Sequence, residues 1–504
     1  MRKGIMAGMA GLALLVAAMP AGATDAAVTR WRQAHEVAIV EQLAAMVRIE
    51  SVAANPAGLA QQADSLVTAL QARGFAARLL PAGGGPPIVY AALDTPGAKR
   101  TVVFYAHYDG QPVKPADWAT PPFQPVLRSG TLAAPVVEAP ASGKFDPEWR
   151  LFGRAVSDDK APLVAFLAAF DALKATGRKP SINIRIVWEG EEEAGSPHLA
   201  AALAAHRDLL KADLWLIGDG PVHQSRRPTI SFGARGVMGL DLTLYGPVRA
   251  LHDGHYGNWV PNPAAMAANL VAAMRDDDGN ILIPGVGDDV RPLTAAEQAA
   301  IAALPPIDAG LMAEFGIARH ESAQGLTLAT MRPALNVSGL RAGGTSNTKV
   351  NAIPTEAEVA LDFRLVPGQT PERVRASVEA FLVARGWTLV TAVPDLAARL
   401  ANPRLLRLKW DDGYPALRSD MASPAGRALI KAASAAAGAP VVALPMMGGS
   451  VPIFMFDQLF GVPIITLPIA NHDNSQHAAN ENLRLQNLWD GIDAYAAMLT
   501  GLDW

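Results

Sequence analysis

Residues 181–196 read SINIRIVWEGEEEAGS, and this stretch decides the fold because a strand pattern in it runs directly into a cluster of carboxylates. Ile182, Ile184 and Ile186 alternate with polar residues, which is the period of a β-strand. The carboxylates of the segment 189–193, EGEEE, follow at once. Two interpretations are open: a solvated acidic loop, or a metal or acid–base site at the carboxyl end of a sheet strand, where open α/β sheets bind ligands.

Strand patterns on either side of this stretch also end in polar residues. The apolar run 101–105 leads to His107 and Asp109, and the run 214–217 leads to Asp219. Helical spacing of apolar residues predicts helices between the strands, at 28–49, 61–73, 162–173 and 198–210. This alternation predicts an α/β fold in which a mostly parallel sheet has helices on both faces. The carboxyl ends of parallel strands share one edge, so we expect the polar ends to converge.

The pattern changes at about residue 229, which divides the chain. From 229 to 418, strand and helix patterns suggest a smaller inserted α/β domain, with elements at 230–245, 263–274, 357–365 and 371–385. The segment 419–504 resumes the apolar style of the first part, and we expect it to complete the first sheet, with elements at 424–437, 441–444, 450–459 and 463–467. Residues 124–149 are rich in Pro, Ala and Gly and predict a long loop.

Composition narrows the possible functions. The chain has 504 residues, half of them hydrophobic, which is typical of a globular protein with two or more domains. A net charge of −4 leaves no basic surplus for binding nucleic acid. The sequence contains no cysteine, which excludes disulfides, thiolate metal ligands and cysteine nucleophiles. Any metal must therefore be held by His, Asp and Glu.

The N-terminus has the pattern of a secretory signal. Arg2 and Lys3 precede an apolar run, 5–19, that is too short to span a bilayer. The small-x-small sequence at 21–23, AGA, is a cleavage site for signal peptidase. We expect residues 1–23 to be a signal peptide and the mature protein to be secreted, to the periplasm in a bacterium, with no membrane attachment after cleavage. An uncleaved membrane anchor is the alternative.

The polar strand ends and two further motifs are candidate sites, although each is ambiguous alone. In His107-x-Asp109, the imidazole can bind a metal while the carboxylate orients it. The neighbours Glu192 and Glu193 point in different directions, so one can bind a metal while the other acts as a base. The remaining motifs also fit simpler roles: Asp158-Asp159 suits a helix N-cap, Asp219 suits a Gly-Asp-Gly turn, and 471–481 is a polar loop with two histidines.

Taken in order, the motifs resemble one family, the dinuclear zinc metallopeptidases. That family includes the carnosinases and cytosolic non-specific dipeptidase, glutamate carboxypeptidase, aminoacylase, acetylornithine deacetylase and succinyl-diaminopimelate desuccinylase. The chain is most similar to the carnosinase-like branch, through segments that span nearly all of the mature sequence: YAHYDGQPV from 105, LFGRAVSDDK from 151, EGEEEAGS from 189, LHDGHYG from 251, FRLVPGQTPE from 363, GGSVP from 448, and His477-x-x-Asn-Glu.

The resemblance implies a zinc-exopeptidase-like catalytic domain, built from 24–228 and 419–504, and a lid and dimerisation domain at 229–418. It also implies two Zn²⁺ per subunit, with Mn²⁺ or Co²⁺ possible instead. The implied ligands are His107 and Asp219 for the first ion, Glu193 and His477 for the second, and Asp158 for both. Asp109 would orient His107, and Glu192 would be the general base for a water shared by the two metals. A cis peptide bond between Asp158 and Asp159 is implied as well.

The implied substrate contacts come partly from the lid. His252 would reach the active site of the neighbouring subunit in a homodimer and stabilise the oxyanion. Arg364 would clamp the free carboxylate of the substrate, and Asn351 and Ser450 would add further contacts. Simpler interpretations remain open, namely an ordinary loop histidine and an ion-paired arginine at a strand edge.

The expected function is that of a metal-dependent exopeptidase that hydrolyses dipeptides or short peptides with a free C-terminal carboxylate. One alternative is an N-acyl-amino-acid amidohydrolase that uses the same metals on an acylated amino acid. A non-catalytic binding protein on a retained peptidase scaffold is another. The segment 419–426, SDMASPAG, lacks the histidine of the carnosinase branch, which argues against carnosinase-like specificity. Ala155 and Ala161 stand where the family usually has glycine.

Overall fold

The computed structural model describes residues 25–141 and 143–504, so the predicted signal peptide lies outside the described residues. The larger lobe is built on an eight-stranded sheet in the order β1-β2-β6-β3-β7-β19-β8-β17. Its strands are β1 Ala76–Ala82, β2 Gly85–Leu93, β3 Thr101–His107, β6 Asn183–Glu189, β7 Leu214–Ile217, β8 Thr229–Ser231, β17 Val442–Leu444 and β19 Ile464–Thr466. The central strands β6, β3, β7 and β19 are parallel, which confirms the predicted α/β class.

Helices cover both faces of this sheet because successive strand residues face opposite ways. Val102 and Phe104 of β3 join one hydrophobic cluster, and Val103 and Tyr105 join another. The first cluster is completed by the long helices α1 Ala26–Arg48, α2 Pro56–Ala72, α3 Lys160–Ala175, α12 Pro424–Ala437 and α14 Leu485–Gly501. The second is completed by the short helices α4 Leu199–Ala205 and α13 Phe454–Phe460. A three-stranded sheet, β20-β5-β4, flanks the lobe (Asn482–Arg484, Arg150–Phe152, Val126–Arg128).

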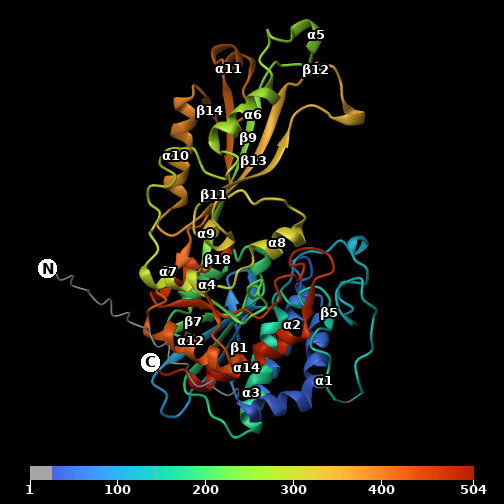
Figure 1. Cartoon of the computed structure of the whole chain (residues 1–504), viewed down its shortest axis with the longest axis vertical. Helices are drawn as coiled ribbons and strands as arrows, with labels where there is room; N and C mark the ends of the chain where they lie inside the picture. Colours follow the sequence, from blue (N-terminus) through green and yellow to red (C-terminus); the bar gives the residue numbers. More distant parts are fainter. Residues whose placement is uncertain (1–24, 142) are drawn as a thin grey trace, which may run out of the picture.

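The smaller lobe extends from the first as Figure 1 shows, and it has a sheet with one covered face. The order is β11-β13-β9-β15-β14, with bounds Ala334–Arg341, Glu356–Leu365, Gly233–Tyr245, Leu405–Trp410 and Thr388–Val390. Helices α6 Pro263–Met274 and α10 Pro371–Ala384 pack on alternate apolar residues of β9 and β13. The opposite face is open and carries charged side chains such as Asp241 and Arg407.

Short elements lie at the tip of the smaller lobe and at the junction of the two lobes (Figure 1). At the tip are β10 Leu251–His252, α5 Asp253–Tyr256, β12 Ala352–Ile353 and α11 Leu396–Ala401. At the junction are α7 Ala295–Ala302, α8 Asp308–Phe315 and α9 Leu326–Thr330. Two more strands, β16 Leu417–Arg418 and β18 Met447–Ser450, pair with the first residues of β9. In the part of the chain that the structure describes, three 3-10 turns lie at Pro115–Asp117, Glu192–Ala194 and Ser346–Thr348.

Two local predictions differ from the structure at this junction. The predicted strand 230–245 is two strands, of which β8 belongs to the larger sheet and β9 to the smaller one. Gly233 allows the change of sheet, because a Cβ there would lie 1.9 Å from the carbonyl oxygen of Leu417. The predicted helix 450–459 begins only at Phe454, because residues 447–450 pair with β9 as β18.

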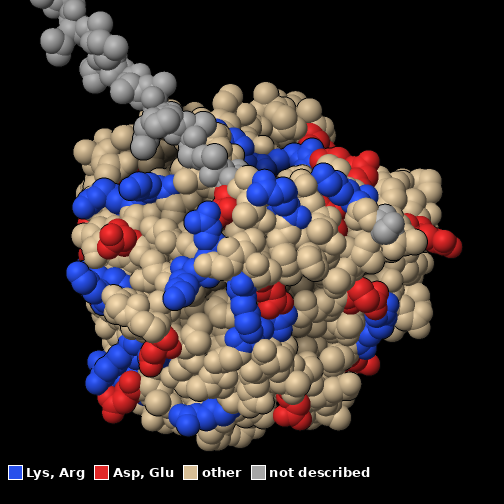
Figure 2. Space-filling view, turned by 90° about the horizontal axis from the view of Figure 1, so that it is seen from below, with Lys and Arg blue, Asp and Glu red and all other residues tan. Residues whose placement is uncertain are grey.

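The surface and the helices add two observations. Figure 2 shows the base of the larger lobe, where basic and acidic side chains are interspersed. Within residues 25–141 and 143–504, no helix has the length and hydropathy required to cross a bilayer.

Candidate metal centre

The predicted site residues of the larger lobe meet at the carboxyl edge of its sheet. His107 ends β3, Asp219 follows β7, and Glu192 and Glu193 form the turn after β6. These three strands are neighbours and parallel, so their ends coincide. Two loops bring the remaining ligands: the one before α3 carries Asp158, and the one after β19 carries His477.

The ligand atoms form two groups that share one carboxylate. The first group is His107, Asp158 and Asp219, and the second is Asp158, Glu193 and His477; within each group the ligand atoms lie within 4.8 Å of one another. Nε2 of His107 lies 3.1 Å from Oδ1 of Asp158, and Nε2 of His477 lies 3.2 Å from Oδ2 of the same residue. This arrangement can hold two metal ions bridged by Asp158. The Asp158–Asp159 peptide bond is cis, as predicted.

Asp109 connects the first group to the acidic turn. Its Oδ1 lies 3.2 Å from Nδ1 of His107, which leaves Nε2 of that ring facing Asp158. The same carboxylate accepts hydrogen bonds from the backbone N–H groups of Glu192 and Glu193, at 3.2 and 3.1 Å. Asp109 therefore orients the imidazole and positions the acidic turn at the same time.

Two supporting residues were not singled out from the sequence. Glu481 is fully buried and accepts hydrogen bonds from the loop that carries Asp158; its donors are Arg154, Ala155, Ser157 and Asp158. Gln111 donates to Oε2 of Glu193 at 2.7 Å. Glu481 was visible as the last residue of His477-x-x-Asn-Glu, but only the fold shows which loop it supports.

The electrostatics of the cluster follow from burial and crowded charge. Burial, together with the charge of Asp158, raises the pKa of Asp219 to about 7. Burial also raises the pKa of Glu192 well above its ordinary value, and nearby carboxylates add to the effect. Hydrogen bonds to Asp158 and Glu193 raise the pKa of His477 to about 10. Burial opposes ionisation of Asp158, but its bonds to His107 and His477 hold its pKa well below the ordinary value.

The donor set fits divalent cations. Imidazole and carboxylate groups without thiolates suit metals that keep positions open for water and substrate. Oδ2 of Asp158 is buried and lies 3.2 Å from Nε2 of His477, which is itself a candidate ligand. Several carboxylates also share this one site, and positive charge would offset their mutual repulsion.

Arg364 and Ser450 meet on the open face of the smaller sheet. The Arg364 guanidinium donates from Nη1 to Oγ of Ser450 at 2.8 Å and from Nε to Oδ1 of Asp362 at 2.7 Å. The ion pair of the simpler interpretation is therefore present, together with the predicted neighbour Ser450. The backbone of Tyr414 pairs with Val237 of the same sheet. Burial, together with the negative charge of Glu192, raises the pKa of its hydroxyl.

His252 and Asn351 lie elsewhere, at the tip of the smaller lobe (Figure 1). His252 is opposite Ala352 in the β10–β12 pair, and Asp253 donates its N–H to the carbonyl of Asn351. The His252 side chain is 57% exposed. The fold of a single chain thus brings these two residues together but places them away from the metal cluster.

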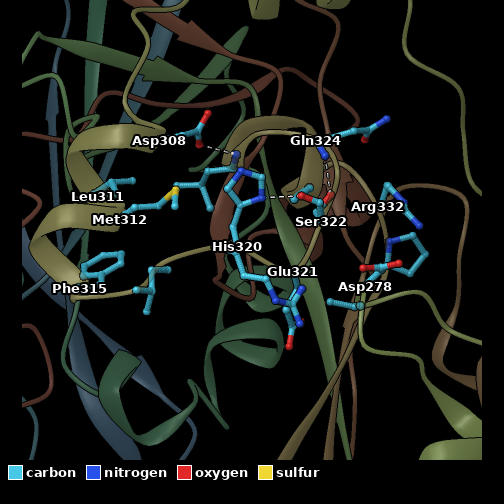
Figure 3. Close-up of a pocket in the computed structure, with 17 residues that line it drawn as sticks. Asp278, Asp308, Leu311, Met312, Phe315, His320, Glu321, Ser322, Gln324 and Arg332 are labelled. Carbon is cyan, nitrogen blue, oxygen red and sulfur yellow. Dashed lines mark hydrogen bonds between the residues drawn. The ribbon is translucent and has the colours of Figure 1, made fainter.

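A separate pocket of about 490 Å³ opens beside α8. In Figure 3, Leu311, Met312 and Phe315 line one side and Arg332 lies on the other. Polar groups around it bond within the chain: His320 pairs with the carbonyl of Ser322, and Glu321 pairs with Arg275. No predicted site residue lines this pocket.

Comparisons with known proteins agree with the geometry. The model of peptidase family M20/M25/M40 matches residues 103–501. A Cys-Gly metallodipeptidase of Schizosaccharomyces pombe is 28% identical over 81% of both chains, and human Beta-Ala-His dipeptidase is 25% identical over 82% of this chain and 76% of its own. Among solved structures, an M20 family metallo-carboxypeptidase from Sulfolobus solfataricus is 26% identical and matches with a TM-score of 0.74, covering 92% of this chain and 98% of its own.

Proposed function

Since this chain belongs to peptidase family M20/M25/M40, we propose that it is a metal-dependent dipeptidase that uses two zinc ions and requires a free C-terminal carboxylate on its substrate. The main support for this proposal is that the two groups of candidate metal ligands share Asp158. Relatives named as dipeptidases match most of the chain and support the choice of dipeptides over acylated amino acids.

The chain's own residues divide the reaction between them. Two bound divalent cations would polarise the scissile carbonyl and make a water molecule more acidic. Glu192 takes the proton from the attacking water and returns it to the leaving amine. Burial raises the pKa of Glu192 well above its ordinary value, which makes its carboxylate a stronger base than an exposed one. Arg364 holds the carboxylate of the substrate and so would orient the scissile peptide bond toward Glu192 and the residues that would hold the metals.

Zinc is the metal that we propose, because the donors are imidazole and carboxylate and because zinc keeps open positions in catalytic sites. Manganese or cobalt accept similar donors. Metal analysis of the purified protein, followed by removal and return of single metals, distinguishes the three.

We also propose a homodimer formed through the smaller lobe, which then acts as lid and dimerisation domain. Large apolar side chains are exposed near His252 at the tip, including Trp259 at 80% and Val350 at 67% exposure, and such exposure is typical of interaction surfaces. In this dimer, His252 would enter the active site of the partner subunit and stabilise the oxyanion. Light scattering on the purified protein tests the dimer, and a monomeric protein would contradict it.

For localisation, we propose export by the N-terminal segment 1–23 and a secreted or, in a bacterium, periplasmic enzyme. The support is the charged start, the short apolar run and the cleavage site in the sequence. Mass spectrometry of the exported protein tests the cleavage, since retention of residues 1–23 would contradict it.

A substrate panel tests the dipeptidase activity itself. The metal-loaded enzyme is incubated with dipeptides of different side chains and, separately, with N-acetyl and N-succinyl amino acids. We expect turnover of dipeptides. Turnover of the acylated amino acids alone would instead identify a deacylase.

A further inference from the structure

Arg235, in the first part of β9, is a buried cation without an acidic partner. Its side chain is only 7% exposed. Nη2 donates to the main-chain oxygen of Arg332 at 2.8 Å, while Nε is buried and has no hydrogen-bond partner. In the described part of the chain, no carboxylate forms an ion pair with this guanidinium. A buried charge is costly unless an opposite charge compensates it, so Arg235 has the character of an anion-binding group.

The strand register places Arg235 beside the predicted substrate clamp. Ser450 of β18 is directly opposite Arg235, and Arg364 of β13 is opposite Val237, two residues along β9. All of these side chains share the open face of the sheet, and long side chains on such diagonal positions reach each other. Burial and the charge of Arg364 lower the pKa of Arg235 to about 10, which agrees with this proximity.

Positive charge exceeds negative charge in the immediate surroundings of Arg235 and Arg364. Arg364 uses Nε for Asp362 and Nη1 for Ser450, so Nη2 remains for a ligand. Asp362 forms an ion pair with Arg364, and its negative charge also acts on Arg235. Two guanidiniums therefore face one acid, and one further negative charge would complete the site.

The same face of the sheet lies beside the metal cluster. Tyr414 pairs with Val237 through a hydrogen bond of 3.0 Å from its N–H to the carbonyl oxygen of Val237. The negative charge of Glu192 and the positive charge of Arg364 both act on the Tyr414 hydroxyl. Geometry makes the same link, because β18 carries both Ser450, opposite Arg235, and Met447, whose Cε would lie 3.3 Å from a Cβ at Gly220, the residue after Asp219. An anion held between Arg235 and Arg364 would thus belong to a substrate that also reaches the metal cluster.

We propose that Arg235 and Arg364 bind the C-terminal carboxylate of the substrate together, with one oxygen on each guanidinium. This inference rests on the proposed function and extends it, because it makes Arg235 a second substrate-binding residue. Two nitrogens of Arg364 are already bonded within the protein, so Arg364 alone is not free to bind both oxygens of a carboxylate. Arg235 would bind the second oxygen.

The experiment compares a dipeptide with its C-terminal amide in the Arg235→Met enzyme. We expect kcat/KM for the free acid to fall about 100-fold, mainly through KM, because a buried charge pair is lost. The amide lacks the charge, so its kcat/KM should be nearly the same in both enzymes. Arg235→Lys keeps the charge but offers no planar fork, and should restore part of the loss.

Arg407→Met is the matched control. Arg407 of β15 lies on the same face of the sheet, opposite Thr243 of β9, to which it donates a hydrogen bond. We expect it to retain the preference of the wild-type enzyme for the acid over the amide. Circular dichroism and bound metal are measured for every variant, and Arg235→Lys provides the test if Arg235→Met does not fold.

Three outcomes would overturn the inference. An equal loss on acid and amide would make Arg235 a structural residue, and a loss confined to substrates with acidic C-terminal side chains would assign it to side-chain recognition. A wild-type enzyme that cleaves no dipeptide would contradict the proposed function, whereas an active wild type with an unaltered Arg235→Met variant would contradict this inference alone.

Discussion

Glu192 and Glu193 are adjacent in sequence, but their surroundings differ, and we expect them to have different roles. Glu193 belongs to a ligand group with His477 and also accepts a hydrogen bond from Gln111. Glu192 belongs to neither ligand group, and burial raises its pKa. Because a base must be able to change its protonation state while a ligand must stay ionised, the two side chains are not interchangeable.

Replacement of Glu192 by Gln should therefore remove turnover and keep the metal. General-base loss typically costs about 10²–10⁴-fold in rate, and we expect kcat to fall by that amount with two metals still bound. Steady-state kinetics and metal analysis measure the two effects. Glu193→Gln is the comparison and should lose metal. An active Glu192→Gln enzyme beside an inactive, metal-loaded Glu193→Gln enzyme would reverse the assignment.

Glu481 permits a second prediction at the residue scale. It holds the backbone of Ser157 and Asp158, and so it fixes the direction of the shared carboxylate. Glu481→Gln should weaken metal binding about 10–100-fold, the usual effect of removing a partner that orients a ligand. Titration of the metal-free protein measures this affinity.

Asp473→Asn is the control for Glu481→Gln. Asp473 lies in the same loop but accepts from Arg150 instead of the segment that carries Asp158. Its replacement should leave the metal affinity unchanged. Equal affinities of wild type and Glu481→Gln would show that the Asp158 loop keeps its shape without Glu481.

At the scale of elements, a carboxylate is buried where helix α14 packs against helix α1. Asp493 of α14 has a side chain that is 14% exposed and lies 3.7 Å from Nε of Arg32 in α1. Burial raises the pKa of Asp493 from 3.8 to about 6, even though Arg32 acts to lower it. The folded protein thus binds this proton more tightly than the unfolded chain does.

The tighter binding of this proton stabilises the folded protein fully below about pH 4, and the stabilisation is lost as the pH rises through about 6. We expect Asp493→Asn to gain stability relative to the wild type over that range, by at most about 3 kcal/mol for a shift of roughly two pKa units. Denaturant unfolding of both proteins at pH 4 and pH 7 measures the difference. A difference that does not change with pH would mean that Asp493 ionises freely in the folded state.

Some elements were predictable to the residue, and their caps explain why. Helices α6 and α12 have the bounds expected from the sequence, 263–274 and 424–437. Each begins with a capping residue followed by proline, Asn262-Pro263 and Ser423-Pro424, which are strong local start signals. The start of α13 was missed because β18 takes residues 447–450 through pairing with a distant strand.

At the scale of the whole molecule, the position of His252 is the main consequence of the two-lobed shape. A residue at the tip of the smaller lobe serves a metal centre in the larger lobe most readily in a second subunit of a symmetric dimer. His252→Ala and Glu192→Gln should each be nearly inactive alone. Mixed after subunit exchange, they should recover about a quarter of wild-type activity, because half of the dimers carry one complete site.

His255→Ala is the control for this complementation, since His255 is three residues away on the same exposed segment. The His255→Ala enzyme should be active when it is assayed alone, without mixing with a second variant. If mixing restores no activity although the subunits are shown to exchange, His252 does not act across a dimer.

The sequence by itself determined the class of the fold, the family and the order of the metal ligands. These depend on local patterns: alternating strands that end in His107, Asp219 and the 192–193 pair, and motifs whose spacing is short. In parallel strands such ends must share an edge, so their convergence could be predicted without coordinates.

Only the tertiary structure decided which groups support the candidate ligands and which arginines lie together. Glu481 reaches the Asp158 loop across more than 300 residues of sequence, and Arg235 comes beside Arg364 through strand register alone. A shift of one residue in that register would turn either arginine to the covered face. Contacts of this kind depend on packing and pairing between distant segments, and no local pattern in the sequence encodes them.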